Sequence, residues 1–359
     1  MYTYIPRVSP IRTEFILEED LFHSEKLADL CKGSGRRVVI VATAHVAKSA
    51  GAKLRSYLNG ELISIPAGKS CKTREMKQQL EDELLKRKCN RDTLLIGIGG
   101  GSLTDLVGFV ASTYMRGVPL ILIPTTLLGM ADAAIGGKNG VDTPRGKNLL
   151  GTFYHPIAVF IDLQLLKTLP PKEWLSGLAE ILKHGLISDP ELWELCEQNP
   201  LSWQNPQTLK QLIRASIVAK MHILEEDLEE LGMRRILNFG HTVGHGLEVL
   251  SQFRMTHGEA VAIGCMVECW LSSHLGYLSP KTLDQILELY HKCGYAKKLP
   301  QGFTRKKFSE SLGLDKKALQ GKPRFVLIER IGHPLSFDGA FCSTIAEKDF
   351  QAMLDWMQK

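Results

Sequence analysis

The first half of the chain alternates short runs of Val, Ile and Leu with stretches of helical periodicity, and no other feature limits the possible folds so strongly. Strands are predicted for RVVIVA (37–42), LISIP (62–66), TLLIGIGGG (93–101) and PLILIPTT (119–126). TREMKQQLEDELLKRK (73–88) predicts an amphipathic helix between the second and third strands. Apolar runs of this kind are typical of strands buried on both faces of a parallel sheet. The alternation therefore predicts an α/β fold in which helices cover a parallel sheet.

The alternation of strand and helix patterns ends at about residue 170, and every long segment after it has helical periodicity. The boundary is predicted in VFIDLQLLKTLPPKE (159–173), where a strand passes into a Pro-rich turn. The sequence therefore predicts an N-terminal, Rossmann-like nucleotide-binding α/β domain over residues 1–168 and a mainly α-helical domain over residues 169–359.

The positive charge of the chain is mild, since 44 Lys and Arg against 39 Asp and Glu give a net charge of +5. The cations are spread along the chain and form no basic block of the kind that binds nucleic acid or a membrane. A small anionic ligand suits this charge equally well. We predict neither a nucleic-acid nor a membrane partner.

None of the eight cysteines lies in a CxxC pair, so their spacing resembles neither a disulfide framework nor a zinc finger. MYTYIPRVSPIRTEF (1–15) lacks the apolar segment of a signal peptide. No apolar run reaches the roughly 18 residues that span a bilayer. These features predict a cytoplasmic protein, with Cys265 and Cys269 as packed core thiols.

A glycine-rich turn, GIGGGSLTDLVGF (97–109), opens a helix directly after a predicted strand. Glycines at such a turn let the backbone approach a pyrophosphate, and the helix N-terminus supplies N–H donors. The alternative is a tight strand–helix turn without a ligand, because the pattern is not GxGxxG. Asp105 lies in the first turns of this helix and is predicted to be a cap or a cofactor contact.

The stretch at 237–264 places three imidazoles and two carboxylates in an otherwise apolar, glycine-rich run. These residues are His241, His245, Glu248, His257 and Glu259. His241 and His245 are four residues apart and share one face of a helix, an arrangement that zinc favours. Glu180 is a candidate third ligand, since an unpaired carboxylate in an apolar helix would be expensive to bury. Two histidines and one carboxylate would leave an open, catalytic position on a metal; the alternative is a set of hydrogen-bonded core histidines.

A glycine-rich, hairpin-like segment at 132–151 carries Lys138, Arg145, Lys147 and Asn148. Three further cations, Arg116, Lys220 and Arg234, lie near the other motifs. Cations among glycines suit a dense anion, such as a phosphate and a carboxylate on one small molecule. An exposed surface lysine is the alternative at each single position.

Five long motifs together resemble the 3-dehydroquinate synthase family of sugar phosphate cyclases. They are GGGSLTDLVGFVASTYMRGVP, PTTLLGMADAAIGGKNGVDTPRGKNLLGTFYHP, TLPPKEWLSGLAEILKHGLI, LNFGHTVGHGLE and HGEAVAIG. The resemblance runs through nearly the whole chain, and DKKALQGKPRFVLIERIG (315–332) extends it.

The resemblance implies an activity in the shikimate route to aromatic amino acids. It converts 3-deoxy-D-arabino-heptulosonate 7-phosphate to 3-dehydroquinate and phosphate. The implied cofactors are NAD, used transiently, and one divalent metal, zinc or cobalt. The implied steps are oxidation, β-elimination of phosphate, return of the hydride and an intramolecular aldol closure. Such an enzyme is a phosphorus–oxygen lyase.

The resemblance also implies a role for particular residues, with the metal and substrate sites in the helical domain. The metal ligands would be Glu180, His241 and His257, whereas His245 would serve proton transfer and phosphate contact. The other implied catalytic residues are Lys138, Lys183, Glu230 and Asn238. The implied substrate-binding residues are Asp132, Lys138, Lys147, Asn148, Lys220, Arg234, Arg116 and one lysine of a pair, predicted as Lys317 with Lys316 as the alternative. The implied cofactor contacts are Gly68, Lys72, Gly100, Gly101, Ser102, Asp105, Thr125, Thr126, Lys138, Lys147, Leu165 and Thr168.

Arg116 in this family reaches the site of the partner subunit, which implies a homodimer. The sequence departs from the family at the nucleotide end, where Thr43 replaces the usual Asp, His45 the usual Asn and Thr104 a usual Gly. Lys69 reverses the charge of the usual Glu. Loss of an acidic group near a ribose hydroxyl leads to the hypothesis that a 2′-phosphate, and hence NADP, is tolerated.

Three other functions remain open on the sequence. Another sugar phosphate cyclase would share the motifs, although Asn238 and the DKK segment at 315–317 favour dehydroquinate. A metal-dependent glycerol or polyol phosphate dehydrogenase would share the architecture but release NADH. An inactive relative would have no need of the metal and cation sets.

Overall fold

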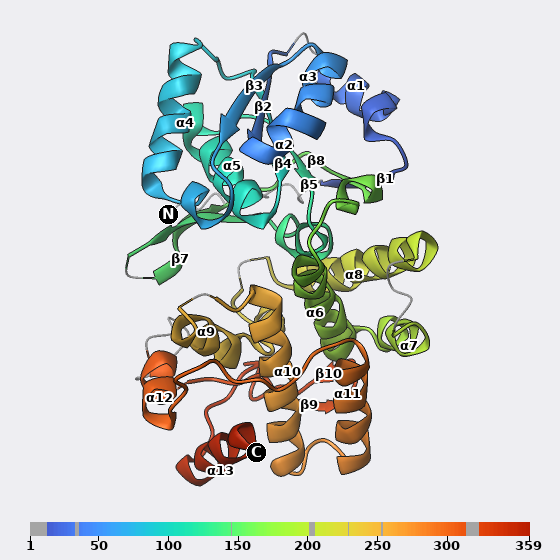
Figure 1. Cartoon of the computed structure of the whole chain (residues 1–359), viewed down its shortest axis with the longest axis vertical. Coiled ribbons are helices and arrows are strands. Elements are labelled where there is room, and N and C mark those ends of the chain that lie inside the picture. The colour runs from blue at the N-terminus through green and yellow to red at the C-terminus, as the bar shows by residue number, and fades with distance from the viewer. Residues whose placement is uncertain are drawn as a thin grey trace, which may run out of the picture. The chain divides into compact units, whose positions relative to one another are not determined.

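The six-stranded sheet of the first part of the chain is the main β structure of this protein, which we describe from a computed structural model (Figure 1). The structure describes residues 13–32, 36–144, 146–200, 205–228, 230–252, 254–313 and 323–359, apart from the Lys69 side chain. The chain divides into two units, Met1–Thr168 and Leu169–Lys359.

All strands of the large sheet run parallel, in the order β1-β8-β5-β4-β2-β3. Their bounds are β1 Glu14–Glu18, β2 Val38–Thr43, β3 Glu61–Ile65, β4 Leu94–Gly99, β5 Leu120–Pro124 and β8 Ala158–Asp162. The four predicted apolar runs form β2, β3, β4 and β5, and every residue of β2, β4, β5 and β8 is buried. The predicted parallel α/β fold is confirmed. Strand β1, which the sequence analysis did not predict, pairs with β8 at the sheet edge.

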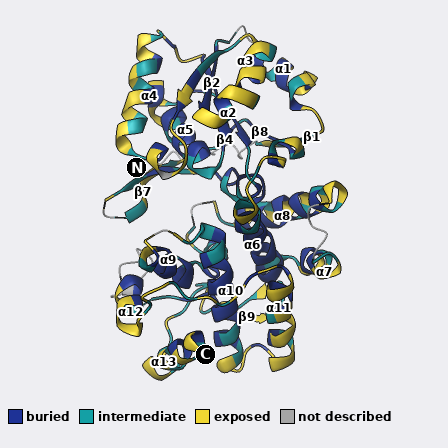
Figure 2. Cartoon of the chain, in the orientation of Figure 1, coloured by how far each residue is buried: buried dark blue, intermediate teal, exposed yellow. Residues whose placement is uncertain are grey.

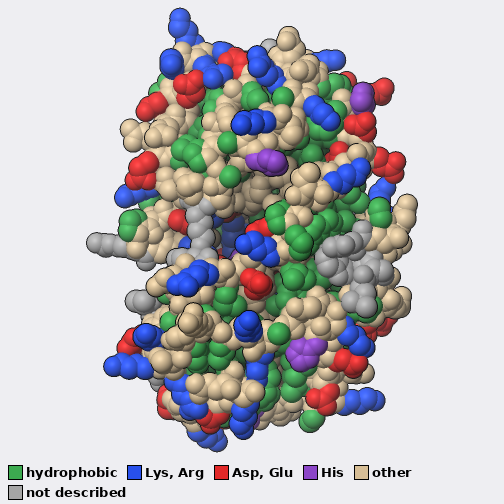
Figure 3. Space-filling view, viewed as in Figure 1, with side chains coloured by type: hydrophobic (Ala, Val, Ile, Leu, Met, Phe, Trp, Pro, Cys, Tyr) green, Lys and Arg blue, Asp and Glu red, His purple; other side chains and the backbone are tan. Residues whose placement is uncertain are grey.

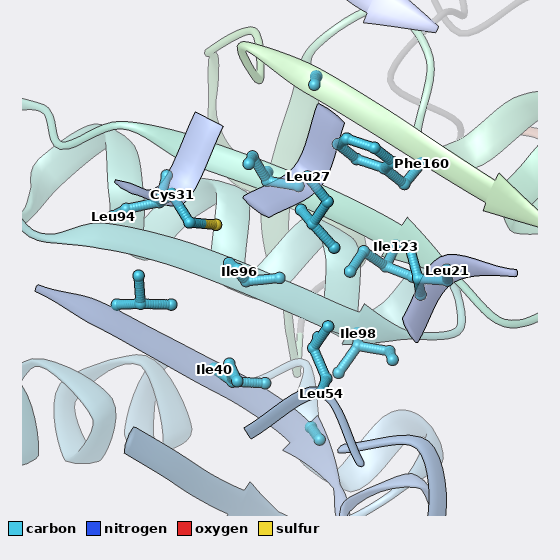
Figure 4. Packing of buried hydrophobic residues seen from close by; sticks show 14 of the residues in the cluster. Leu21, Leu27, Cys31, Ile40, Leu54, Leu94, Ile96, Ile98, Ile123 and Phe160 are labelled. Carbon is cyan, nitrogen blue, oxygen red and sulfur yellow. The ribbon is translucent and has the colours of Figure 1, made fainter. Parts of the chain in front are cut away.

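One face of this sheet packs against the N-terminal helices, as Figure 4 shows. Ile40, Ile96 and Phe160 project from three strands into a cluster with Leu27 of α1 (Glu25–Lys32) and Leu54 of α3 (Ala52–Leu58). Alternate residues along a strand share a face, so the apolar runs supply this core at every second position.

Helix α5 (Gly101–Thr113) covers the opposite face of the sheet. Its approach is close: a Cβ on Gly97 would lie 3.2 Å from the Val107 Cβ, and one on Gly99 would lie 3.1 Å from the Leu103 Cβ. The absence of a side chain at these two glycines of the predicted strand therefore allows helix α5 to pack closely against the strand.

The remaining elements of the first unit are short helices and one hairpin. Helix α4 (Arg74–Lys86) contacts α5, and the antiparallel pair β6 (Lys138–Thr143) and β7 (Gly146–Phe153) packs on α5. The short helical elements are η1 Leu21–His23, α2 Ala44–Val46, η2 Ala47–Gly51, η3 Gly68–Cys71, η4 Tyr114–Arg116, η5 Gly129–Ala133 and η6 Leu163–Leu166.

The second unit is mainly helical and is built around α10 (His257–His274), which contacts α6, α9, α11 and α13. The other elements are α6 Pro171–Ser188, α7 Pro190–Gln198, α8 Pro206–Glu226, η7 Met233–Asn238, α9 His241–Leu250, α11 Pro280–Lys292, α12 Arg305–Gly313, β9 Ile328–Arg330, β10 His333–Pro334 and α13 Glu347–Gln358. Most of α6 and α10 is buried (Figure 2). Cys265 and Cys269 are fully buried on α10, as expected.

The glycines of HGEAVAIG let α10 touch the backbone of its neighbours. A Cβ on Gly258 would lie 2.2 Å from the Ser176 carbonyl oxygen of α6, and one on Gly264 would lie 1.9 Å from the Gly240 carbonyl oxygen before α9. Both clashes involve backbone, which cannot rotate away. These two contacts hold the start of α10 against α6 and the start of α9 against α10.

Gly264→Ala is therefore expected to lower the free energy of unfolding by about 1–3 kcal/mol or more, because the added methyl group overpacks the contact with Gly240. Thermal denaturation followed by circular dichroism measures the loss. Gly146→Ala is the control, since its Cβ would meet only the exposed Leu149 side chain, at 3.1 Å. An equal stability of the two variants would contradict the expectation.

In the part of the chain that the structure describes, no helix is long and apolar enough to cross a bilayer. All eight cysteines fall within the described residues, and none of them is joined in a disulfide.

Candidate functional site

Three side chains of the second unit converge on one point. Glu180 is fully buried on α6, and its Oε1 lies 3.6 Å from His241 Nε2 and 3.2 Å from His257 Nε2. The candidate ligand atoms of the three residues all lie within 4.8 Å of one another. These are the residues that the resemblance implies as metal ligands.

The ends of helices place the two imidazoles. His241 is the first residue of α9 and follows Gly240, whose φ of 76° is a left-handed conformation that glycine adopts readily. His257 is the first residue of α10, where Thr256 and Glu259 form a capping box. Glu259 thus has a structural role: its Oε2 accepts the Thr256 N–H at 2.7 Å.

Lys183 compensates the buried charge of Glu180. It lies one turn further along α6, with Nζ 2.5 Å from Glu180 Oε2, and it also donates to the Leu237 carbonyl at 3.0 Å. The Lys183 side chain is only 2% exposed, so the two charges are buried as a pair. One carboxylate oxygen faces the ammonium while the other faces the imidazoles.

His257 lies between two carboxylates. Burial by itself would lower its pKa, but hydrogen bonding to Glu180 and Glu248 raises the pKa to about 9. The His245 ring lies 5.4 Å from the His241 ring and 6.3 Å from the His257 ring, centroid to centroid. His245 is therefore beside the Glu180 group, but it is not among the atoms facing that carboxylate.

Glu180, His241 and His257 are better explained as ligands of a divalent metal than as hydrogen-bonded residues of the core. Two imidazole nitrogens and one carboxylate oxygen are the ligands of many catalytic zinc sites. The His241 and His257 side chains are 12% and 28% exposed, so they border accessible space and are not sealed in the core. The imidazoles would have to be neutral to bind a metal, so metal uptake would be favoured as the pH rises.

A polar segment after α8 carries three of the other implied residues, and α8 carries a fourth. Asn238 Nδ2 donates to Glu230 Oε1 at 3.0 Å, and the Arg234 guanidinium, 1% exposed, donates to the Leu228 carbonyl at 2.6 Å. Lys220 is buried on the adjoining helix α8. Glu230 has a φ of 63°, an uncommon conformation for a residue with a side chain.

Asp227, which the sequence analysis did not single out, organises this segment. Its carboxylate accepts N–H groups of Leu231 at 3.1 Å, Gly232 at 2.7 Å and Arg234 at 3.0 Å. Burial tends to raise the pKa of Asp227, but these backbone hydrogen bonds lower it below its usual value. A single Asp after a helix is too common a pattern to have predicted this.

Asp227→Asn is expected to lower the free energy of unfolding by about 1 kcal/mol at neutral pH, because backbone N–H groups bind a charged acceptor more strongly. The folded pKa is depressed, so the stabilisation exists above the unfolded pKa of about 3.9 and is lost as the pH falls through the folded pKa. Urea denaturation at several pH values should show the two proteins converging below about pH 3. A difference that does not change with pH would contradict this explanation.

In the first unit, several implied cofactor contacts lie at the carboxyl ends of β4 and β5. Gly100 precedes α5, and the Thr125 N–H donates to the Gly99 carbonyl at 2.9 Å, which joins the two strand ends. A Cβ on Gly100 would lie 3.1 Å from the Thr126 Cγ2. The first turn of α5, where Gly101 and Ser102 lie, carries N–H groups without partners inside the helix, as an anion site requires.

Lys72 forms a buried polar group with two other implied residues. Its ammonium pairs with Asp105 and donates to Asn148 Oδ1 at 2.5 Å. Burial by itself would lower the Lys72 pKa, but the Asp105 carboxylate raises it above its usual value. Asp105 is therefore paired and is not a helix cap, and Lys72 connects it to Asn148 of the β6–β7 hairpin.

The other implied residues lie as follows. Asp132 lies in η5, Leu165 in η6, Thr168 at the end of the first unit, Lys138 at the start of β6, Lys147 on β7, and Gly68 in η3 with a φ of 71°. Arg116 ends η4 with a φ of 65° and is exposed. Arg145, Lys316 and Lys317 lie outside the described residues.

The residues that differ from the family pattern in the predicted nucleotide-binding unit lie in different surroundings. Thr104 is 1% exposed, and its hydroxyl donates to the Gly101 carbonyl at 2.9 Å, so α5 accommodates the larger residue. Thr43 ends β2 and is buried, whereas His45 is exposed on α2.

A parallel α/β unit with a glycine turn, followed by a helical unit in which two histidines face a buried glutamate, defines a class: a metal- and nucleotide-dependent enzyme. The family models of 3-dehydroquinate synthase match this chain over residues 62–176 for the N-terminal part and 177–318 for the C-terminal part. The chain belongs to the 3-dehydroquinate synthase family.

Known proteins agree with this membership. The 3-dehydroquinate synthase of Synechococcus sp. is 37% identical over 325 residues, 88% of either chain. Among solved structures, 2-epi-5-epi-valiolone synthase from Streptomyces hygroscopicus, with NAD+ and Zn2+ bound, has a TM-score of 0.88 at 29% identity over 99% of both chains. A 2-deoxy-scyllo-inosose synthase complexed with carbaglucose-6-phosphate, NAD+ and Co2+ has a TM-score of 0.87 at 24% identity, covering 95% of this chain and 96% of its own, and shows the shared fold.

Proposed function

We propose that this chain is a 3-dehydroquinate synthase, which converts 3-deoxy-D-arabino-heptulosonate 7-phosphate to 3-dehydroquinate and phosphate. The observation that carries the proposal is the buried Glu180 carboxylate facing the Nε2 atoms of His241 and His257. The chain that carries these three residues matches the 3-dehydroquinate synthase family in both its N-terminal and its C-terminal part. The reaction releases phosphate by elimination, so the enzyme is a phosphorus–oxygen lyase.

Glu180, His241 and His257 would hold one divalent metal, zinc or cobalt, in the second unit. A metal held there would supply a Lewis acid for adjacent substrate hydroxyls, and a bound NAD would supply a transient hydride acceptor. Lys183 keeps Glu180 charged and in place. His245, beside the ligands, would move a proton and contact the phosphate.

Cations of this chain would bind the two anionic groups of the substrate. In the second unit, Lys220 and Arg234 are already buried, so their charge acts with little screening by water. The Glu230–Asn238 hydrogen bond fixes two further polar groups for orientation of the hydroxyls. In the first unit the proposed substrate contacts are Arg116, Asp132, Lys138, Lys147 and Asn148.

The proposed cofactor contacts lie in the first unit. Gly100, Gly101 and Ser102 would present N–H groups of α5 to the pyrophosphate, with Thr125 and Thr126 beside them. The remaining proposed contacts are Gly68, Lys72, Asp105, Lys138, Lys147, Leu165 and Thr168.

The test of this function is phosphate release from the heptulosonate phosphate by metal-stripped protein, with and without added zinc, NAD and NADP. Phosphate and dehydroquinate formed in equal amounts without net NADH are expected. Steady accumulation of NADH would identify a dehydrogenase instead. A sugar phosphate without the carboxylate is the control substrate, and its preferred use would point to another sugar phosphate cyclase.

The nucleotide preference of the stripped protein is a separate prediction. Thr43 stands where the family has an acidic residue, so no carboxylate at that position repels a 2′-phosphate, and NADP is expected to bind within about tenfold of NAD. Titration of NADH and NADPH fluorescence measures both dissociation constants, and Thr43→Asp is expected to weaken NADPH selectively. Strict selection of NADH by the unaltered chain would remove the hypothesis.

We further propose a cytoplasmic homodimer in which Arg116 acts in the partner's site. Arg116 is exposed, and both it and Met115 have positive φ, at 65° and 49°. Such strained turns persist mostly where function requires them. Acidic and basic side chains are interspersed on the surface of each unit in Figure 3, which suits a small-molecule enzyme better than a nucleic-acid or membrane protein.

A further inference from the structure

The His257 ring has a carboxylate at each of its nitrogens. Nε2 lies 3.2 Å from Glu180 Oε1, and Nδ1 lies 3.7 Å from Glu248 Oε2. Glu248 comes from α9, and its side chain is only 4% exposed. A buried carboxylate needs a positive or hydrogen-bonding partner, and the His257 ring is one that the structure places beside Glu248.

His241 shows the same arrangement with a different acceptor. Its Nε2 also faces Glu180 Oε1, and its Nδ1 lies 3.1 Å from the Phe239 carbonyl oxygen. Both imidazoles thus turn Nε2 toward one carboxylate oxygen and place an acceptor behind Nδ1. A carbonyl acceptor in one case and a carboxylate in the other would both select the tautomer with the proton on Nδ1.

We propose that Glu248 is the positioning residue of the metal site: its carboxylate faces Nδ1 of His257 and would accept the Nδ1–H, so that the Nε2 lone pair is directed at the metal that Glu180 would also bind. Acceptors behind metal-bound histidines fix the ring and make the ligand nitrogen more basic. The inference rests on the metal site of the proposed function. Glu248 itself touches neither metal nor substrate in this arrangement.

The competing arrangement uses Glu248 as a ligand. His245, Glu248 and His257 also offer ligand atoms within 4.8 Å of one another. Through Nδ1, His257 would then bind a metal on the Glu248 side, and its proton would lie on Nε2. The two arrangements therefore predict opposite tautomers of one ring.

Variants of Glu248 test the role through metal affinity. Zinc affinity is measured by chelator competition on metal-stripped protein, and Co2+ loading is followed by visible absorption. Glu248→Ala is expected to weaken zinc binding by about 10–100-fold. Glu248→Gln keeps an acceptor oxygen and should lose less affinity, with an altered Co2+ spectrum.

Glu259→Gln is the matched control. Glu259 is two residues from His257, but its carboxylate caps α10. This variant should lower the melting temperature of the metal-free protein and weaken zinc binding much less than Glu248→Ala does. Equal zinc affinities of the Glu248 variants and the unaltered chain would overturn the proposal.

Nitrogen-15 spectra of the histidine rings show which ring nitrogen carries the proton. They are recorded on the unaltered, zinc-loaded protein, so this test does not depend on whether a variant folds. A proton on Nδ1 of His257 is expected, and a proton on Nε2 would overturn the proposal in favour of the Glu248 ligand set. Glu180→Gln distinguishes a failure of the proposed metal site from a failure of the proposed Glu248 role. If it binds zinc as tightly as the unaltered chain, the proposed metal site fails along with the inference; if it does not, the Glu248 results decide the inference alone.

Discussion

Replacement of Glu180 by glutamine is expected to abolish tight zinc binding and to lower kcat about a thousandfold, which corresponds to about 4 kcal/mol of transition-state stabilisation from the metal. The amide oxygen is a weaker ligand, and Lys183 would then face a neutral group 2.5 Å or so from its ammonium. Breaking a buried ion pair costs about 3–5 kcal/mol, so the variant should also unfold more easily. Zinc titration and initial rates of phosphate release measure the two effects.

Two further variants separate metal loss from instability. His241→Ala removes a ligand while leaving the Glu180–Lys183 pair intact, and we expect a similar loss of activity with a smaller change in stability. Glu173→Gln, also on α6 and partly exposed, is the control and should keep both zinc and activity. Full activity of Glu180→Gln in zinc-free buffer would contradict the metal site.

Two inactive variants, Arg116→Ala and Glu180→Gln, are expected to restore activity when they assemble together. In a mixed dimer, the subunit with an intact metal site would receive Arg116 from its partner. Random assembly of equal amounts makes half of the dimers mixed, each with one complete site of two, so about a quarter of the normal rate should return. Coexpression with two different tags and purification through both isolates the mixed dimer.

The mixing experiment also tests the homodimer directly. Arg116→Ala by itself is expected to lose at least about a hundredfold in kcat/KM, as removal of one transition-state donor does. The control pair is Glu180→Gln with His241→Ala, which damage the same site and should not complement each other. If Arg116 acts within its own subunit, the first mixture stays as inactive as its parts.

Local sequence patterns predicted the elements that depend on local physics. The apolar runs became β2, β3, β4 and β5; β2, β4 and β5 are buried on both faces, and such a strand must be apolar at every position. The helix predicted at 73–88 is α4, Arg74–Lys86, since its apolar residues recur at helical spacing. Strand β1 was missed because EFILE mixes charge with apolar residues, as an edge strand does.

The candidate metal ligands could be proposed from sequence because their residue types are conspicuous in an apolar run. Residue spacing by itself favoured the pair His241 and His245, which share a helix face. The family motifs implied Glu180, His241 and His257 instead, and the structure brings these three side chains together, with His245 beside them. The spacing could not choose among the three histidines because the choice depends on how α9 and α10 meet α6.

The amino-acid sequence was sufficient for the α/β pattern, the family resemblance and the list of chemical groups, because periodicity and motifs report each segment's own burial and chemistry. Tertiary structure decided which groups face each other: Lys183 with Glu180, Glu248 behind His257, and Asp227 under the Arg234 segment. The sequence did not indicate these pairings, in which the partners are one lysine and two carboxylates. Their roles arise from packing between segments far apart in the chain, at distances that backbone contacts such as Gly264 against Gly240 set.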